Sequence, residues 1–210
     1  SSSRVVGLMN VGDATFFFAN SPSSGFYSRR GLWVTDGSLA STRWVVDLPS
    51  DVSDAKAIGQ ANGVYFFQAT ASGSSGGLWR SDGTAAGTFK VKSLLAGAKG
   101  DQLDFAELDG VLYFGAGGQN NYELWRSDGT EAGTYVVKEL SDSGGLNSGF
   151  SLQITRLGAA IYFSVNNGAT RGLWKSDGTG DGTTLVQAFG SAPAYLLRGG
   201  DSLYFAASSG

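Results

Sequence analysis

The chain contains no cysteine and no histidine among its 210 residues, and it has only three prolines. Without cysteine it can form neither a disulfide framework nor a thiolate metal site. Without histidine it lacks the commonest general base and the commonest transition-metal ligand, so these residues cannot assemble serine–histidine–aspartate chemistry. We therefore expect no enzyme activity, no cofactor and no bound metal.

Long apolar runs and clusters of basic side chains are missing too. No stretch approaches the roughly 18 consecutive apolar residues of a membrane span, so we expect none. The 15 basic and 18 acidic side chains give a net charge of −3, and the basic ones are scattered. Because phosphate neutralisation needs clustered Lys and Arg, nucleic acid is not an expected partner. The opening SSSRVVGLMN lacks the features of a signal peptide and is expected to be a mature or trimmed end.

Helical periodicity is also absent, whereas glycine is abundant, with 33 residues. Helix-forming residues never recur at a spacing of 3.6 over a long window. Many short strands joined by glycine turns are the natural interpretation of this pattern. The sequence therefore predicts an all-β fold.

A seven-residue word recurs along the chain. LWRSDGT begins at Leu78 and again at Leu124, and the variants LWVTDGS and LWKSDGT begin at Leu32 and Leu173. The tryptophans of these words are separated by 46, 46 and 49 residues and stand at Trp33, Trp79, Trp125 and Trp174. A fixed period of this length indicates a propeller, a solenoid or a similar array. Four unrelated active sites would not share one period, so the word is predicted to be structural.

A second word supplies strands whose two faces are both apolar. It occurs five times, at residues 14–20, 63–69, 110–116, 160–165 and 202–208. Within it, Val64, Tyr65 and Phe66 point alternately to opposite faces, so both faces must be covered. This requirement is met in a propeller blade, which packs against the preceding and the following blade. The tryptophans of the seven-residue words are expected between blades.

Residues 102–140 contain one complete unit. Its predicted strands are QLDFAEL, VLYFGA, ELWRS and TYVVKEL, with an Asp109-Gly110 turn after the first and a DGTEAG turn after the third. Asp-Gly is among the strongest hairpin signals, because glycine accepts a positive φ. Each such turn offers one carboxylate, whereas calcium needs six to eight oxygens. The aspartates of the repeated words are therefore predicted to form turns: Asp36, Asp82, Asp128 and Asp177.

These words resemble the bacterial ELWxxDGT tandem repeat family over nearly the whole chain. Only Glu123 matches the leading Glu of the motif; Gly31, Gly77 and Gly172 replace it elsewhere, and Ser38 replaces the final Thr of the first copy. The resemblance implies a β-propeller within a large secreted or cell-surface bacterial protein. The resemblance implies where the protein is located more than which biochemical role it has.

The strand count predicts a five-bladed β-propeller of four-stranded blades in a single domain, residues 1–210. The four complete units are expected at about residues 8–48, 55–94, 102–140 and 150–188. Residues 192–210 supply only two strands, so residues 1–7 are expected to pair beside them in a closing blade shared by the two chain termini. The competing interpretation is a fragment of a longer, open array.

Within such blades, the two ends of the strands carry different kinds of loop. One end holds the uniform Asp-Gly turns; the other, here called the variable rim, holds residues 20–30, 70–76, 117–123 and 166–171 and the crossings between blades. Function is commonly carried on diverse loops held by a rigid frame. The candidate ligand-binding residues therefore lie on this rim: Tyr27, Arg29, Arg30, Asn120, Asn121, Tyr122, Asn166, Asn167 and Arg171.

Two functions remain open. The first is a non-catalytic, lectin-like binding module for a glycan or another surface polymer, in which repeated blades provide avidity. The second is a structural or adhesive spacer or assembly subunit, with a protein partner or self-association and no small-molecule site. An enzyme ranks third, since only Asp101, Asp104 and Glu107 gather in one stretch. Trp44 is unusual for its position in the outer strand of the repeat, because the other repeats have Lys90, Val136 and Leu185 there.

Overall fold

The structure, a computed structural model, describes residues 5–22, 30–71, 76–94, 105–117, 122–140, 153–166 and 171–208. These residues form eighteen β-strands and no helix, as the glycine-rich sequence predicted, and so include no helix suited to crossing a membrane. The chain divides into two compact units, Ser1–Leu94 and Leu95–Gly210, and each is described by itself.

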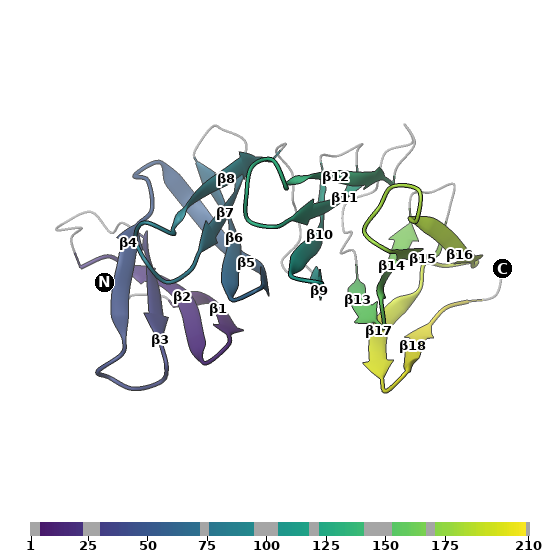
Figure 1. Cartoon of the computed structure of the whole chain (residues 1–210), viewed down its shortest axis with the longest axis horizontal. Helices are drawn as coiled ribbons and strands as arrows, with labels where there is room; N and C mark the ends of the chain where they lie inside the picture. Colours follow the sequence, from purple (N-terminus) through teal and green to yellow (C-terminus); the bar gives the residue numbers. More distant parts are fainter. Residues whose placement is uncertain are drawn as a thin grey trace. The chain divides into compact units, whose positions relative to one another are not determined.

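The first unit contains two four-stranded antiparallel sheets, here called blades 1 and 2 (Figure 1). Blade 1 consists of β1 (Val6–Val11), β2 (Ala14–Asn20), β3 (Arg30–Thr35) and β4 (Arg43–Asp47). Blade 2 consists of β5 (Val52–Ala61), β6 (Val64–Ala71), β7 (Gly77–Ser81) and β8 (Phe89–Ser93). Each strand pairs with its neighbour in the sequence, so each blade is a simple meander.

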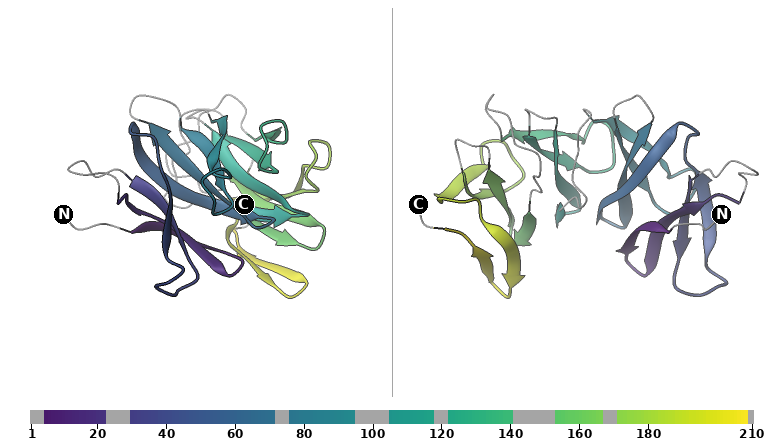
Figure 2. Two further views of the ribbon diagram at one scale, coloured as in Figure 1. Left: turned by 60° about the vertical axis from the view of Figure 1, so that its left-hand side comes forward. Right: turned by 180° about the vertical axis from the view of Figure 1, so that it is seen from behind.

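The second unit contains two more such sheets, blades 3 and 4, and a separate two-stranded sheet. Blade 3 consists of β9 (Phe105–Leu108), β10 (Val111–Gly117), β11 (Tyr122–Ser127) and β12 (Tyr135–Glu139). Blade 4 consists of β13 (Ile154–Leu157), β14 (Ala160–Asn166), β15 (Arg171–Ser176) and β16 (Thr184–Ala188). The two-stranded sheet is the hairpin of β17 (Ala194–Gly199) and β18 (Ser202–Ala206), which is yellow in Figure 2.

An aromatic core joins blades 1 and 2. Phe16 stacks on Tyr65 with ring centroids 5.0 Å apart, and Phe18 meets Phe67 edge-on at 5.1 Å. All four rings are buried, and Trp79 packs against the same core. Both faces of these strands are thus covered, as the consecutive bulky residues predicted.

An equivalent core joins blades 3 and 4. Tyr113 and Leu124 of blade 3 pack in one cluster with Ile161 and Phe163 of blade 4, and Trp174 packs against it. The predicted position of the tryptophans between blades is confirmed for Trp79 and Trp174. Trp125 is buried and stacks on Phe114 of its own blade at 6.5 Å.

The predicted closing blade is wrong in its strand pairing. Val6 and Gly7 belong to β1, and Val6 pairs with Phe18 of β2 rather than with the 202–208 segment. Residues 1–4 of the expected closing strand lie outside the described residues. The physical reason lies in tertiary contacts: Gly7 has a φ of +66° at an irregular point of the register, and its missing Cβ lets the Phe18 ring of β2 approach. Among the described residues, the fifth sheet therefore has two strands instead of three or four.

Candidate functional site

The Asp-Gly-Thr turns between the third and fourth strands fold around their aspartates. In blade 2, Asp82 Oδ1 accepts hydrogen bonds from the Thr84 backbone N–H at 2.9 Å and from its hydroxyl at 2.7 Å. The Thr84 Oγ1 in turn accepts one from the Gly87 N–H at 2.9 Å. A Cβ on Gly87 would overlap the Asp82 carboxylate, so only glycine fits there. The second glycine is therefore a packing requirement of the turns in blades 2, 3 and 4, since Gly133 and Gly182 meet Asp128 and Asp177 in the same way. In blade 1, Ser41 stands at this position and its hydroxyl donates to Asp36.

The residues that flank this turn close it from both sides. Ser81 Oγ accepts a hydrogen bond from the Gly83 N–H at 3.1 Å and shares a second one, of 2.7 Å, with Thr88 Oγ1. Gly83 has a φ of +88°, which glycine adopts without strain. The turn-forming role predicted for the repeated words is thus confirmed.

The same bonds hold Asp128 and Asp177 in blades 3 and 4. In blade 1 the Ser41 hydroxyl and the Ser38 backbone N–H bind Asp36 and lower the pKa of its carboxyl to about 2. The described residues hold no group of three side chains able to bind a metal ion. The aspartates of the four repeated words are therefore already engaged in hydrogen bonds within their turns.

The opposite end of each blade carries the variable rim. The last residue pairs of the second and third strands are Asn20 with Arg30, Gly117 with Tyr122, and Asn166 with Arg171. Four of the nine predicted ligand-binding residues thus lie at the bases of these loops: Arg30, Tyr122, Asn166 and Arg171. Only the backbone is described for Tyr122 and Asn166, and the other five residues lie outside the described part of the chain: Tyr27, Arg29, Asn120, Asn121 and Asn167.

Arg30 and Arg171 begin the third strands of their blades and fasten each loop to the end of the fourth strand. Their carbonyl oxygens accept hydrogen bonds from the Leu48 and Phe189 N–H groups at 3.0 and 2.8 Å. The exposed Arg171 guanidinium also donates to the Gly190 carbonyl at 3.1 Å. Backbone bonds of this kind give the loops rigid bases, and the Arg30 side chain remains partly exposed.

A second internal pattern, next to the Leu-Trp word, was not predicted from the sequence. The buried Glu123 carboxylate accepts a hydrogen bond from the Trp125 indole N–H at 2.8 Å. Where glycine replaces this glutamate, a side chain of the fourth strand fills the space: Trp44 Nε1 lies 3.0 Å from the Cβ position of Gly31, and Lys90 Cε lies 2.5 Å from that of Gly77. The signal was present in the sequence, because the only copy with Glu also has the smallest partner in the fourth strand.

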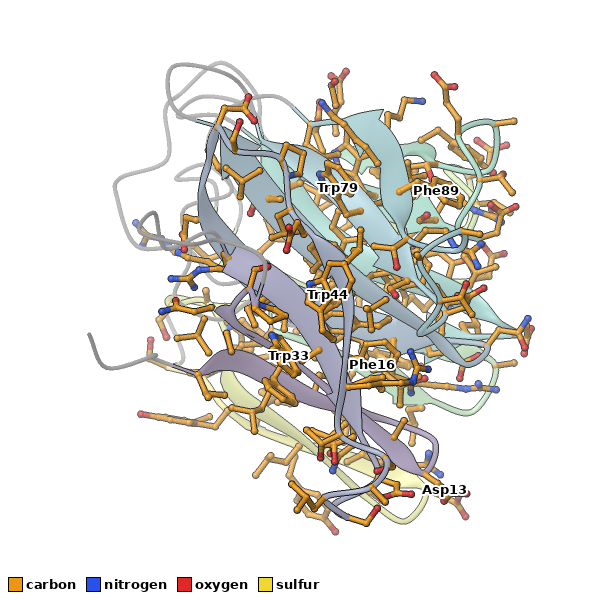
Figure 3. All side chains as sticks on the ribbon, turned by 90° about the vertical axis from the view of Figure 1, so that its left-hand side faces the viewer. Asp13, Phe16, Trp33, Trp44, Trp79 and Phe89 are labelled. Carbon is orange, nitrogen blue, oxygen red and sulfur yellow. The ribbon has the colours of Figure 1, made fainter. Side chains whose placement is uncertain are left out.

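This pattern explains Trp44. The residue pairs directly with Trp33 across β3 and β4, and both are labelled on blade 1 in Figure 3. Its indole N–H donates to Asp47 Oδ1 at 3.1 Å, and its ring covers Gly31. Trp44 thus fills the space that the glutamate occupies in blade 3.

The acidic stretch considered for catalysis has a structural role where it is described. Glu107 Oε1 accepts a hydrogen bond from the Gly110 N–H at 2.6 Å, and its other oxygen lies 3.5 Å from Arg156 Nη1. Arg156 also reaches Asp109 at 3.5 Å. Asp101 and Asp104 lie outside the described residues. The carboxylate of Glu107 is therefore engaged in holding a turn.

Comparisons with known proteins support this architecture. Neither a family model nor a curated protein matches the sequence. A chain in the crystal structure of a nidogen/laminin complex is similar, with a TM-score of 0.52 and 12% identity, over 98% of this chain and 72% of that one. A structure from a study of two prolyl endopeptidases has a TM-score of 0.54 and 16% identity, over 97% of this chain but only 32% of that one. At these identities the similarity concerns the fold alone, which is β-propeller-like.

Proposed function

We propose that this chain is a non-catalytic binding module that recognises a glycan or another surface polymer through its variable rim. The observation that carries the proposal is the difference between the two ends of the blades. At one end, four turns of nearly identical structure use their carboxylates and hydroxyls in internal hydrogen bonds. At the other end, diverse loops rise from rigid strand pairs that bear Arg30 and Arg171.

The side chains of this rim suit a carbohydrate. Asn and Arg offer hydrogen-bond donors and acceptors for sugar hydroxyls, and a Tyr ring can cover the apolar face of a sugar. Equivalent loops on successive blades would give several weak sites, and a polymer with repeated units would engage them together. A multivalent ligand therefore fits the repeated architecture better than a single small molecule does.

The setting proposed for this module is an exported bacterial protein, secreted or attached to the cell surface. Support comes from the resemblance of the four Leu-Trp words to the ELWxxDGT repeats. Adhesion through surface carbohydrates would be a natural task for such a protein.

A glycan array tests the proposal. We expect binding to one class of glycan, and loss of about ten-fold or more in affinity when Tyr27→Ala or Tyr122→Ala removes a stacking ring. Glu131→Ala, an exposed substitution within a uniform turn of blade 3, is the matched control and should bind like the unmodified chain. A silent array, or equal binding by all variants, would contradict the proposal.

A second candidate function is a structural or assembly subunit. It is favoured by the exposed apolar side chains of β16, β17 and β18, among them Val186, Leu197 and Tyr204. The nidogen/laminin neighbour also belongs to a complex between proteins, although the likeness extends only to the fold. A silent glycan array together with a protein partner, or with self-association in sedimentation, would select this function.

A further inference from the structure

Two-residue turns of the same backbone shape join the first two strands of blades 2 and 3. In blade 2 the turn is Asn62-Gly63, between β5 and β6, and in blade 3 it is Asp109-Gly110, between β9 and β10. The φ values are +49° and +74° in the first turn and +53° and +79° in the second. Turns with two positive φ values match the twist of the flanking strands and favour Asn-Gly and Asp-Gly. The two turns therefore differ in one side-chain group and in their surroundings.

Asparagine followed by glycine can react within its own backbone. The glycine nitrogen attacks Cγ of the asparagine, and the side-chain nitrogen leaves as ammonia, taking the proton that the glycine nitrogen loses. The product is a five-membered succinimide ring. Water then opens the ring at Cγ to give aspartate, or at the backbone carbonyl carbon to give isoaspartate. Water is the only other reactant, and glycine favours the attack because it has no side chain to hinder the approach.

A hydrogen bond from the glycine N–H holds the attacking nitrogen in place and so opposes this reaction. The structure describes seven Asn-Gly or Asp-Gly dipeptides, and in six of them the glycine N–H donates to a side-chain oxygen. At 2.6 to 3.1 Å, the six bonds run from Gly37 to Thr35, Gly83 to Ser81, Gly110 to Glu107, Gly129 to Ser127, Gly178 to Ser176 and Gly182 to Thr179. Gly63 is the seventh, and its N–H has no acceptor among the described residues.

The contrast between blades 2 and 3 has a cause in the sequence. Glu107 stands one strand pair before its turn and accepts the Gly110 N–H at 2.6 Å. Gln60 stands at the same register position in blade 2, and it does not accept the N–H of Gly63. Both residues of the Asn62-Gly63 turn are exposed, so water reaches the reacting atoms.

We propose that Asn62 is a site of spontaneous deamidation through a succinimide with Gly63, and that it reacts faster than any other asparagine in the described part of the chain. The reaction makes the net charge of −3 more negative by one. The site goes beyond the proposed binding function, because it lies at the opposite end of the blade from the variable rim.

The two products affect blade 2 differently. Aspartate at position 62 reproduces the Asp109-Gly110 turn, which has nearly the same φ values. Isoaspartate routes the main chain through Cβ and Cγ, which lengthens a two-residue turn by one atom and disturbs the register of β5 and β6. The buried Tyr65 and Phe67 follow directly in β6. The isoaspartyl form is therefore the less stable product.

Peptide mapping tests the proposal. The whole chain is incubated at mildly alkaline pH, digested with trypsin and analysed by mass spectrometry with fragmentation. Residues 57–80, between Lys56 and the cleavage after Arg80, form the peptide that carries Asn62. We expect conversion there to lead that at Asn10 and Asn20, which valine and serine follow. An isoaspartyl methyltransferase distinguishes isoaspartate from aspartate.

Two variants isolate the role of the N–H group. Asp109→Asn creates the same dipeptide in a matched turn whose glycine N–H is bound by Glu107. That turn should react about ten-fold or more slowly than Asn62, because a hydrogen bond to a charged group must first break. Gln60→Glu introduces the same acceptor beside Gly63 and should slow the reaction of Asn62. Urea unfolding checks that both variants remain folded.

The outcomes separate clearly. Equal rates at the two Asn-Gly turns, an unchanged rate in Gln60→Glu, or an Asn62 that persists after Asn10 or Asn20 has reacted would overturn the proposal. The isoaspartyl form should unfold at lower urea than the Asn62→Asp variant, which models the other product. Equal stability of the two forms would overturn the inferred effect on blade 2.

Discussion

Trp33, Trp125 and Trp174 occupy the same position in three blades, but only one of them has a partner for its indole N–H within the described residues. Trp125 donates to Glu123, whereas the buried Nε1 atoms of Trp33 and Trp174 have no acceptor. A buried donor without a partner costs about 1–3 kcal/mol. Where Gly stands in place of Glu at this position, the indole N–H therefore loses its hydrogen-bond acceptor, and a side chain of the fourth strand packs in the space instead.

The first prediction tests, in blade 1, whether a glutamate acceptor and a packed fourth-strand side chain exclude each other. Gly31→Glu alone should destabilise the protein, because the Trp44 ring occupies the space of the new side chain. With Trp44→Val added, the glutamate can accept the Trp33 N–H as Glu123 accepts that of Trp125. Urea unfolding of the four members of this double-mutant cycle should show a favourable coupling of about 1–2 kcal/mol. Additive effects would show that the two positions are independent.

The second prediction concerns Trp125. Trp125→Ala should lower the free energy of unfolding by about 3–5 kcal/mol, since it leaves a cavity beside Phe114. It also leaves the buried Glu123 carboxylate without its donor. Trp125→Phe is the comparison that keeps a stacked ring but removes the N–H group, so its loss should be smaller. A cost below about 1 kcal/mol for Trp125→Ala would mean that the residue is not part of a packed core.

At the scale of the element, each Asp-Gly-Thr turn is a closed set of hydrogen bonds built on one carboxylate. The Thr84 hydroxyl and N–H lower the pKa of Asp82, and Thr179 lowers that of Asp177 in the same way. The charged form of each carboxyl is therefore favoured by folding. Such a group adds to stability above its unfolded pKa, and the contribution disappears as the pH falls through its folded pKa.

The third prediction follows from these shifts. For Asp36 the pKa falls from 3.8 to about 2, so stability should be flat at neutral pH and decline as the pH drops from about 4 towards 2. Asp82→Asn should reduce this decline, because one of the four contributing carboxylates is gone. Asp51→Asn, at an exposed aspartate outside the Asp-Gly turns of the repeated words, serves as control. Urea unfolding from pH 2 to 7 measures the effect; an unchanged decline in Asp82→Asn would contradict it.

The fourth prediction concerns metal removal. Because hydroxyl and backbone N–H groups already bind Asp82 and Asp128, the turns should form without a cation. Addition of a chelator should leave the Tm nearly unchanged, and added calcium should not raise it. A large fall in Tm with chelator would instead assign a calcium site to these carboxylates.

At the scale of the whole molecule, the repeated words predicted most of the fold because each carries its own local physics. The Asp-Gly turns, the two-faced strands and the tryptophans between blades follow from residues such as Gly83, Tyr65 and Trp79, whose contacts lie within one or two blades. Because these features recur in four copies of the repeat, each copy supports the same prediction of the fold. The β-propeller-like architecture could therefore be recognised from the sequence alone.

The pairing of the N-terminal segment and the details of the site could not be predicted in this way. Val5 and Val6 look like the Val-Val pair of a fourth strand, and local pattern does not distinguish that strand from a first one. The choice is made by tertiary contacts: the Phe18 ring lies over Gly7, and the buried Tyr65 hydroxyl donates to the Gly7 carbonyl at 3.1 Å. The variable rim differs from blade to blade, so no repeat supports a prediction of its ligand.

The last prediction concerns how stability is distributed along the array. Repeat proteins owe their stability to interfaces between neighbouring units, so a unit covered on one side only should open first. The central strands β6 and β14 are buried, through residues such as Phe67 and Phe163, whereas most of β16 and β18 is exposed. Hydrogen exchange followed by mass spectrometry should show β18 exchanging faster than β14 by about two orders of magnitude. Uniform protection from β2 to β18 would contradict this gradient, because it would mean that the chain opens as one cooperative unit.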